Sequence, residues 1–164
     1  MLVKRHTSDF PHFMLHELGS IGQPLVFLHR LFIRPFLAPS FPAFWRDWNP
    51  VYRYLLALYF YRPLHRRFPR GLAVFLTFVG CGLLLHDLPF FAGYRWFRGE
   101  FALPAGTILF SIFGLLTLLS ERIGLDFSKY PTIVRAAANV GWIVLSIGLS
   151  RLAIVFLLWI KHKS

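Results

Sequence analysis

The sequence predicts an all-α, multi-pass membrane protein with about three transmembrane helices, preceded by re-entrant or interfacial helices. Of its 164 residues, 56% are hydrophobic and only 15% are charged, whereas a soluble domain is usually about 45–50% apolar and about 25% charged. Three apolar stretches after residue 70 approach the length that a membrane-spanning helix needs. An aromatic content of 18% excludes a disordered chain, and a single cysteine, Cys81, excludes a disulfide-stabilised fold.

The formal net charge of +11 is better explained by a membrane surface than by nucleic acid. A nucleic-acid-binding protein carries its basic patch on a soluble body, which this composition does not predict. Lys and Arg residues beside apolar helices instead face anionic lipid headgroups. Membrane lipid is therefore an expected partner, and nucleic acid is not.

The first 70 residues contain no stretch long enough to cross a membrane. Residues 1–11 begin basic but have no apolar core after them, so no cleavable signal peptide is expected. Residues 24–28 are apolar, but they are too few to cross about 30 Å of hydrocarbon, and arginines and prolines come directly after them. We therefore divide the chain into a polar or interfacial segment at 1–23, a core segment at 24–160 and a tail at 161–164.

Residues 51–61 are expected to form a helix in the membrane interface. They contain four of the six tyrosines and come after Trp45 and Trp48, and both residue types favour the level of the lipid headgroups. Pro63 is expected to end this helix, because proline breaks the helical hydrogen-bond pattern.

The three later stretches are predicted to be transmembrane helices, because backbone polar groups in lipid must be satisfied within the segment. They comprise residues 71–93, 101–120 and 136–160. The third stretch is interrupted by Arg151. Residues 124–131 are predicted to be the loop between the second and third helices.

Lys and Arg residues are unevenly distributed around these helices. Ten of them precede the first stretch, against two in the loop after it and three in the next loop. The positive-inside tendency therefore places the N-terminal region on the cytoplasmic side. Arg151 is expected either to snorkel or to pair with an acidic group such as Glu121 or Asp87, and Ala137 and Gly141 form a small-residue packing face.

His86 and Asp87 are the clearest candidates for a chemical role. Both interrupt the first apolar stretch, about 22 Å along a helix that starts at residue 71. Ionisable groups at such a depth are costly and tend to face a cavity, and a neutral imidazole there suits a general base. Asp87 lies about 100° further round the helix and is not expected to bond to His86. In the alternative interpretation both residues close a helix near the membrane surface, because Pro89 comes two residues later.

A second candidate is the block Phe44–Asn49, which crowds two indoles, a guanidinium, a carboxylate and a carboxamide into six positions. One interpretation is an aromatic belt with a local pair between Arg46 and Asp47. In the other, the side chain of Asn49 donates a hydrogen bond to a carbonyl oxygen, as an oxyanion-stabilising amide does.

No metal site is predicted. His12 and His16 have the i, i+4 spacing of a metal-binding pair, but no third ligand accompanies them. Cys81 is expected to serve helix packing, because small residues let helices approach each other. His86, five residues on, does not share its helix face and is not expected to activate its thiol.

Four short motifs stand in order along the chain, namely Phe32–Pro35 (FIRP), Phe44–Asn49 (FWRDWN), Tyr61–Leu64 (YRPL) and Gly82–Leu88 (GLLLHDL). Their order resembles that of the motifs in the wax-synthase-like branch of the membrane-bound O-acyltransferases. Residues 110–121 are similar to the helix after the histidine in that branch. The resemblance thus covers most of the chain from residue 24 to about residue 160.

The resemblance implies transfer of a fatty acyl group from acyl-CoA, the co-substrate, to the hydroxyl of a lipid-soluble alcohol. His86 would take the proton from that hydroxyl, and Asn49 would orient the acceptor or stabilise the carbonyl oxygen. Arginines would meet the coenzyme A phosphates or, alternatively, anionic lipid. No metal or tightly bound cofactor is required. The implied substrate-binding residues are Trp45, Arg46, Trp48, Asp87, Arg62 and Arg66.

The chain departs from the family pattern in two ways. The spacing before His86 is one residue longer than the usual Ser-Gly-Leu-x-His, and Cys81 and Gly82 stand where Ser-Gly is usual. Family members also carry several further N-terminal helices that help to enclose the reaction chamber. A homo-oligomer or a partner chain is expected to supply such helices. The alternative is a non-catalytic membrane subunit, or a truncated relic of the family, that acts in assembly or lipid contact.

Overall fold

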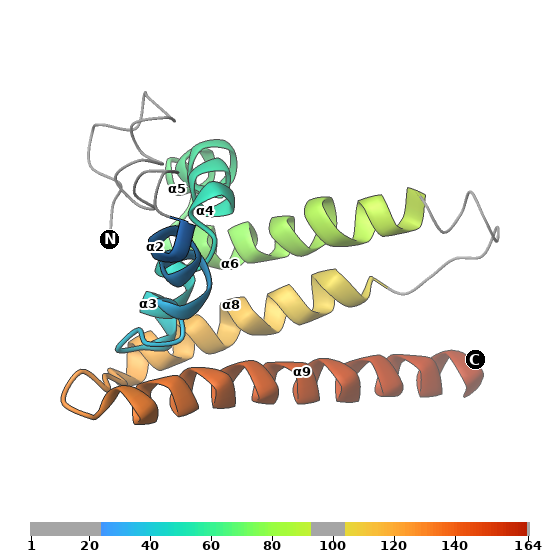
Figure 1. The fold of residues 1–164 in the computed structure, drawn as a ribbon. Helices are drawn as coiled ribbons and strands as arrows, with labels where there is room; N and C mark the ends of the chain where they lie inside the picture. Colours follow the sequence, from blue (N-terminus) through green and yellow to red (C-terminus); the bar gives the residue numbers. More distant parts are fainter. Residues whose placement is uncertain (1–23, 93–103, 164) are drawn as a thin grey trace.

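The computed structural model describes residues 24–92 and 104–163 (Figure 1). Within these ranges every regular element is a helix and no strand occurs, which confirms the predicted all-helical fold. Three helices are long and apolar enough to cross a membrane, as the apolar stretches predict. Shorter helices from the first part of the chain gather at one end of the long ones (Figure 1).

The first two long helices lie side by side and run in opposite directions (Figure 1). The first is α6 (Arg70–Cys81), which continues through η3 (Gly82–Asp87) as far as Ala92. The second is α8 (Ala105–Ile123). The end of the bundle at which α6 begins is therefore the end at which α8 finishes.

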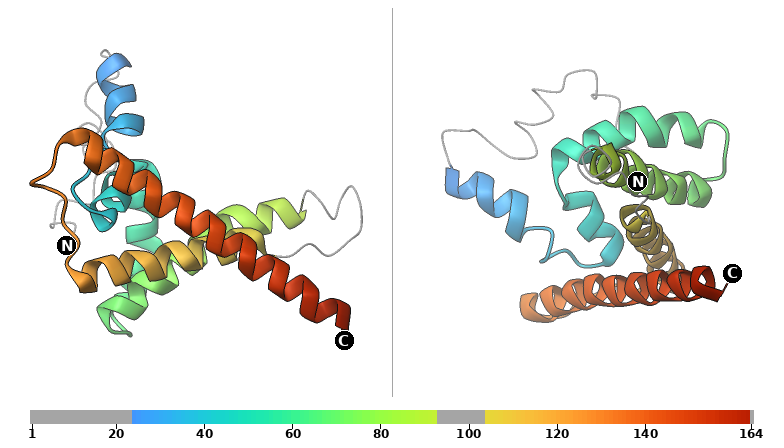
Figure 2. Two further views of the ribbon diagram at one scale, coloured as in Figure 1. Left: turned by 90° about the horizontal axis from the view of Figure 1, so that it is seen from below. Right: turned by 90° about the vertical axis from the view of Figure 1, so that its right-hand side faces the viewer.

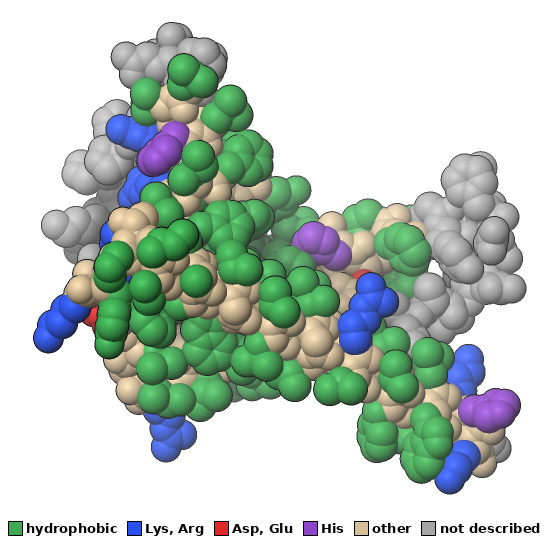
Figure 3. Space-filling view, turned by 60° about the horizontal axis from the view of Figure 1, so that its bottom comes forward, with side chains coloured by type: hydrophobic (Ala, Val, Ile, Leu, Met, Phe, Trp, Pro, Cys, Tyr) green, Lys and Arg blue, Asp and Glu red, His purple; other side chains and the backbone are tan. Residues whose placement is uncertain are grey.

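The third long helix, α9 (Thr132–Lys163), crosses α8 obliquely when the molecule is seen from below (Figure 2, left). The loop before it starts at Gly124, whose φ of 73° is a left-handed conformation that glycine adopts without strain. The helix extends beyond the predicted stretch at both ends and includes residues 161–163. Only 11% of the most apolar 18-residue stretch of this helix is buried inside the protein. Hydrophobic side chains also cover much of the molecular face seen in Figure 3.

The short helices precede α6, and none of those described reaches the length of a membrane span. They are α2 (Pro24–Leu28), η1 (His29–Ile33), α3 (Phe41–Asp47), α4 (Pro50–Leu56), η2 (Ala57–Tyr61) and α5 (Arg62–His65). The last three form one continuous helix, which is seen nearly end-on in Figure 1 and from the side in Figure 2 (right). This confirms a helix over residues 51–61.

Three prolines each come after a π-helical segment, namely Pro35 after η1, Pro63 after η2 and Pro89 after η3. The N–H of the residue just before each proline bonds to the carbonyl five residues back. This wider turn moves the carbonyl with which a proline ring would clash in an α-helix. The predicted helix end at Pro63 is therefore wrong, because the chain stays helical to His65, and likewise it stays helical past Pro89 to Ala92.

The buried core is an aromatic cluster where α3 meets α8 and α9. Phe41 and Phe44 of α3 are each only 1% exposed. The ring of Phe41 stacks on Trp142 of α9 at a centroid distance of 5.6 Å and lies 6.4 Å from Phe113 of α8. Such aromatic pairs contribute about 0.5–1.5 kcal/mol each beyond the burial of their area. The cluster therefore anchors the Phe44–Asn49 block between the two long helices.

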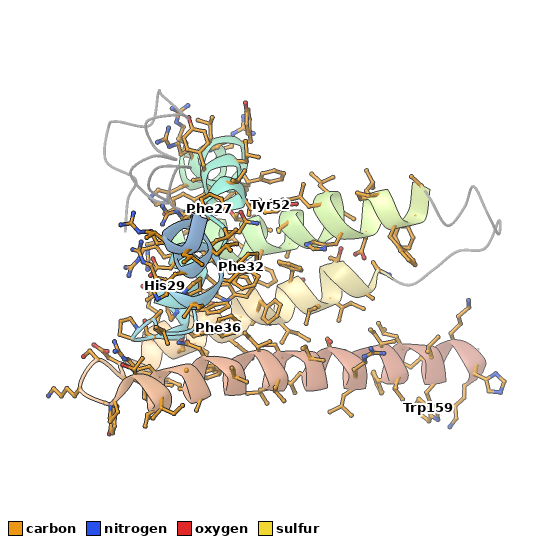
Figure 4. The ribbon with its side chains drawn as sticks, in the orientation of Figure 1. Phe27, His29, Phe32, Phe36, Tyr52 and Trp159 are labelled. Atoms are coloured by element: carbon orange, nitrogen blue, oxygen red, sulfur yellow. The ribbon has the colours of Figure 1, made fainter. Side chains whose placement is uncertain are left out.

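A buried amide fixes α9 to the turn after η1. The Nδ2 of Asn139, a residue only 2% exposed, donates hydrogen bonds to the carbonyl oxygens of Phe36 (labelled in Figure 4) and Ala38, both at 2.9 Å. In the loop before α9, the N–H of Phe127 donates to the carbonyl of Pro39 at 2.7 Å. The sequence pattern did not single out Asn139, although a carboxamide inside an apolar helix is the type of side chain that ties helices to backbone groups.

The ion pair between Arg70 and Glu121 is expected to contribute little to stability. The two side chains join α6 to α8 with a nitrogen–oxygen distance of 2.6 Å, but they are 50% and 39% exposed. We expect the Arg70→Ala variant to lose less than about 1 kcal/mol in the free energy of unfolding, because exposed ion pairs are weak. Titration with SDS, followed by tryptophan fluorescence, would measure this. A loss of about 3–5 kcal/mol, as for a broken buried pair, would contradict it.

Candidate functional site

His86 lies on η3, in the later part of the first membrane-spanning helix, and its side chain is exposed. The imidazole stacks on the ring of Phe110 of α8, with a centroid distance of 4.5 Å and an interplanar angle of 28°. Neither ring nitrogen has a hydrogen-bond partner among the described residues. A ring held by its face in this way keeps both nitrogens available for proton transfer. Since the helix continues past Pro89, the alternative that His86 marks a helix end is wrong.

Asp87, the next residue, is buried and points into the start of α8. It is 4% exposed, its Oδ1 accepts a hydrogen bond from the N–H of Gly106 at 2.7 Å, and its Oδ2 accepts one from the N–H of Thr107 at 2.6 Å. The first N–H groups of a helix lack internal partners, and Pro104, at the N-cap of α8, supplies no side-chain bond. Asp87 therefore caps α8 from another helix, and it does not bond to His86, as predicted.

The backbones of η3 and α8 touch at two glycines. A Cβ on Gly82 would lie 2.7 Å from the carbonyl oxygen of Gly106 and 2.7 Å from the Cα of Thr107. A Cβ on Gly106 would lie 2.8 Å from Oδ1 of Asp87 and 2.8 Å from the Cβ of His86. Small residues permit such an approach between membrane helices, so both positions require glycine.

Trp45 and His86 lie against the same aromatic ring. Phe110 contacts His86 and also lies 6.2 Å, between ring centroids, from Trp45 of α3. The Nε1 of Trp45 is buried and has no hydrogen-bond acceptor within the described residues. The structure thus brings the first tryptophan of the Phe44–Asn49 block close to His86, with Phe110 common to both.

Asn49 occupies the corner between α3 and α4, and it caps α4. Its φ of 37° is left-handed, and its Oδ1 accepts a hydrogen bond from the N–H of Tyr52 at 3.3 Å. The Nδ2 keeps its two N–H donors unused by the described residues. No hydrogen bond or ring contact in that part of the chain joins Asn49 to His86. Trp48, just before it, is 37% exposed and stacks on Phe44 at 5.3 Å.

The arginines near this block lie in two places. Asp47 forms ion pairs with Nε of Arg46 at 3.7 Å, as predicted, and with Nε of Arg34 at 3.5 Å. The second pair joins the FIRP motif to the FWRDWN motif. Arg62 lies on α5 and Arg66 is exposed just after it, at the end of the bundle where α6 begins. The start of α6 is roughly 24 Å along the helix from His86, so these two arginines are not brought to His86.

Arg151 lies exposed on α9 and forms no ion pair with the residues that the structure describes. The two acids considered for it are engaged elsewhere, since Glu121 pairs with Arg70 and Asp87 bonds to α8. Cys81 is 6% exposed, in keeping with a packing role.

No metal site is evident in the described ranges, where no group of three or more His, Cys, Asp or Glu side chains could hold an ion. His12 and His16 lie outside those ranges. Sequence reasoning missed Gly106, Thr107 and Phe110. The start of α8 did offer a signal, because Pro104 is followed by Ala and Gly and supplies no capping side chain.

Comparison of the chain with protein-family models, with curated proteins and with solved structures finds no match. The resemblance of its four motifs to the membrane-bound O-acyltransferases is therefore a prediction, and the geometry around His86 is the structural evidence that bears on function.

Proposed function

We propose that the chain is a membrane O-acyltransferase that transfers a fatty acyl group from acyl-CoA to the hydroxyl of a lipid-soluble alcohol. The observation that supports this most is the environment of His86. Its imidazole lies on a membrane-spanning helix, rests by its face on Phe110, and has no protein partner on either nitrogen in the described chain. An ionisable side chain inside a membrane span is a functional candidate by default.

In the proposed reaction, a ring nitrogen of His86 takes the proton from the alcohol as its oxygen attacks the thioester carbonyl carbon. The new carbon–oxygen bond forms, and the carbonyl oxygen becomes negatively charged. The charge then returns to the carbonyl, the carbon–sulfur bond breaks, and the imidazolium gives its proton to the departing thiolate. The products are an ester and free coenzyme A, and the histidine is restored.

The remaining predicted residues would bind and orient the substrates. Asn49 has two N–H donors that no described residue uses, and these would orient the alcohol or stabilise the oxyanion. The proposed contacts to substrate also include Trp45, Arg46 and Trp48. Asp87, the other predicted substrate-binding residue, is instead bonded to the N–H groups of Gly106 and Thr107. Arg62 and Arg66 lie at the basic end of the bundle, where they would meet the coenzyme A phosphates. Anionic lipid is the alternative ligand of these arginines.

The cluster of basic residues at this end of the bundle also supports an orientation of the chain in the membrane. The short helices and the start of α6 carry most of the arginines, and Arg122, Lys129 and Arg135 lie near the end of α8 and the start of α9. We propose that this end faces the cytoplasm, because positive residues are retained there. Acyl-CoA would then reach the arginines from the cytoplasm.

Ester formation by the full chain alone tests the proposed function. The purified chain in lipid vesicles would be given labelled palmitoyl-CoA and a mixed set of long-chain alcohols, sterols and glycerolipids. We expect a labelled ester of at least one acceptor, and none in vesicles without the protein. Absence of any ester from folded chain, with free coenzyme A also unchanged, would contradict the proposal.

A non-catalytic membrane subunit is the second candidate, and the outward face of α9 favours it. Ala137, Gly141 and Gly148 are exposed, and a Cβ on either glycine would meet nothing within 4 Å. The predicted small-residue face is therefore not used within the described chain and is open to a second copy or another chain. On this hypothesis His86 and Asn49 tolerate substitution, whereas Gly141→Leu disrupts assembly. Turnover by the purified chain would exclude it.

A further inference from the structure

The first two turns of α8 contact the segment that carries His86 in three ways. They provide the N–H groups of Gly106 and Thr107 to the Asp87 carboxylate. They place Gly106 so close to His86 that a Cβ added to the glycine would lie 2.8 Å from the Cβ of His86. One turn further on, they provide the ring of Phe110 on which the imidazole rests. Because residues i and i+4 share a helix face, Gly106 and Phe110 present these contacts on the same side of α8.

Both oxygens of the Asp87 carboxylate are engaged by the start of α8. Both oxygens accept short hydrogen bonds from backbone N–H groups, and the residue is 4% exposed. The N-terminus of a helix favours a negative charge, so the carboxylate is stabilised there without a cation. A substrate would have to displace α8 to reach it.

We propose that Asp87 is a positioning residue that holds η3 against the first turn of α8 and thereby orients the imidazole of His86 on Phe110. Gly106 contributes to the same positioning, because a side chain at this residue would push η3 and α8 apart. The consequence for catalysis rests on the proposed acyltransferase function, whereas the orientation of the ring does not. The inference therefore has a structural readout and a kinetic one.

The structural readout is the nuclear magnetic resonance signal of the His86 ring in the full chain, labelled at histidine and reconstituted in lipid nanodiscs. His86→Gln identifies the signal, and Phe110→Leu shows where it lies without the stacked ring. We expect Asp87→Leu and Gly106→Ala to move the signal towards its position in Phe110→Leu. In Asp87→Asn, which retains one acceptor oxygen, the His86 signal is expected to lie between its positions in the intact chain and in Asp87→Leu. Gly71→Ala is the matched control and should leave the signal in place, because a Cβ at Gly71 would meet nothing within 4 Å.

The kinetic readout separates positioning from substrate contact. A displacement of about 1 Å can cost roughly 10²-fold in rate, so Asp87→Leu is expected to lower kcat by roughly 10²-fold with the KM for palmitoyl-CoA and for the alcohol unchanged. Asp87→Asn should recover part of the lost kcat. A rise in KM with unchanged kcat would instead assign Asp87 to substrate binding and overturn the proposal.

The two readouts distinguish failure of this inference from failure of the proposed function. If the signal moves in Asp87→Leu and Gly106→Ala but the intact chain forms no ester, the orientation is established and the acyltransferase function is wrong. If the folded variants leave the His86 signal in place, the positioning role is wrong whatever the activity. Should Asp87→Leu fail to fold, Asp87→Asn and Gly106→Ala decide the question by the same signal.

Discussion

Replacing His86 with alanine is expected to reduce ester formation by about 10²–10⁴-fold, the usual contribution of a general base. In the proposed reaction a nitrogen of this ring accepts the proton of the alcohol. The fold should be retained, because the side chain is exposed and, within the described ranges, contributes one stacking contact, with Phe110. The rate of labelled ester formation in vesicles, at equal amounts of folded protein, measures the effect.

The matched control for this prediction is His29→Ala. His29 lies exposed on η1 (labelled in Figure 4), away from η3, and its side chain forms no contact that the proposal uses. Its removal should leave the rate unchanged. Equal rates in His86→Ala and the intact chain would show that another group takes the proton, and the proposed mechanism would fail.

Replacing Asn139 with leucine is expected to lower the free energy of unfolding by roughly 2–6 kcal/mol. Leucine is similar in size but has no donor, so the carbonyl oxygens of Phe36 and Ala38 would both lose their partner. Each buried group left unsatisfied costs about 1–3 kcal/mol. The loss should appear in SDS titration followed by tryptophan fluorescence, because Trp142 packs on Phe41 beside this contact.

Ser146→Ala is the control, since Ser146 is also buried on α9 but bonds within its own helix, to the carbonyl of Trp142 at 2.8 Å. Its loss should cost less than about 1 kcal/mol, as for an ordinary hydrogen bond. If the two variants were equally stable, the turn after η1 would not depend on α9, and the role assigned to Asn139 would be wrong.

The long helices could be predicted from the sequence because their signal is local. A run of apolar residues predicts a membrane span whatever it packs against, and the loop at 124–131 is indicated by its turn-forming residues. The pair between Arg46 and Asp47 was equally accessible, because the two residues are adjacent. Arg34, the other partner of Asp47, was not, because its approach depends on how η1 turns into α3.

The sequence could predict which residues of η3 belong to the candidate site, but it could not predict which residues of α8 contact them. His86 and Asp87 stand out in the sequence because ionisable groups inside an apolar stretch are rare. Their partners Gly106, Thr107 and Phe110 lie on another helix, and no local pattern tells which face of α8 will meet η3. The contact of Asn139 with Phe36, 103 residues apart, is hidden for the same reason.

The π-helical segment before Pro89 has a further consequence, which concerns the counting of residues between motifs. Compared with the Gly-Leu-x-His spacing that the motif resembles, this chain has one residue more before His86. A turn whose N–H groups bond five residues back contains one residue more than an α-helical turn. The π-helical turn of η3 can therefore accommodate an inserted residue while the side chains of the next turn keep their direction around the helix axis. On the proposed family resemblance the chain is one position longer there, and His86 and Asp87 meet α8 in the structure.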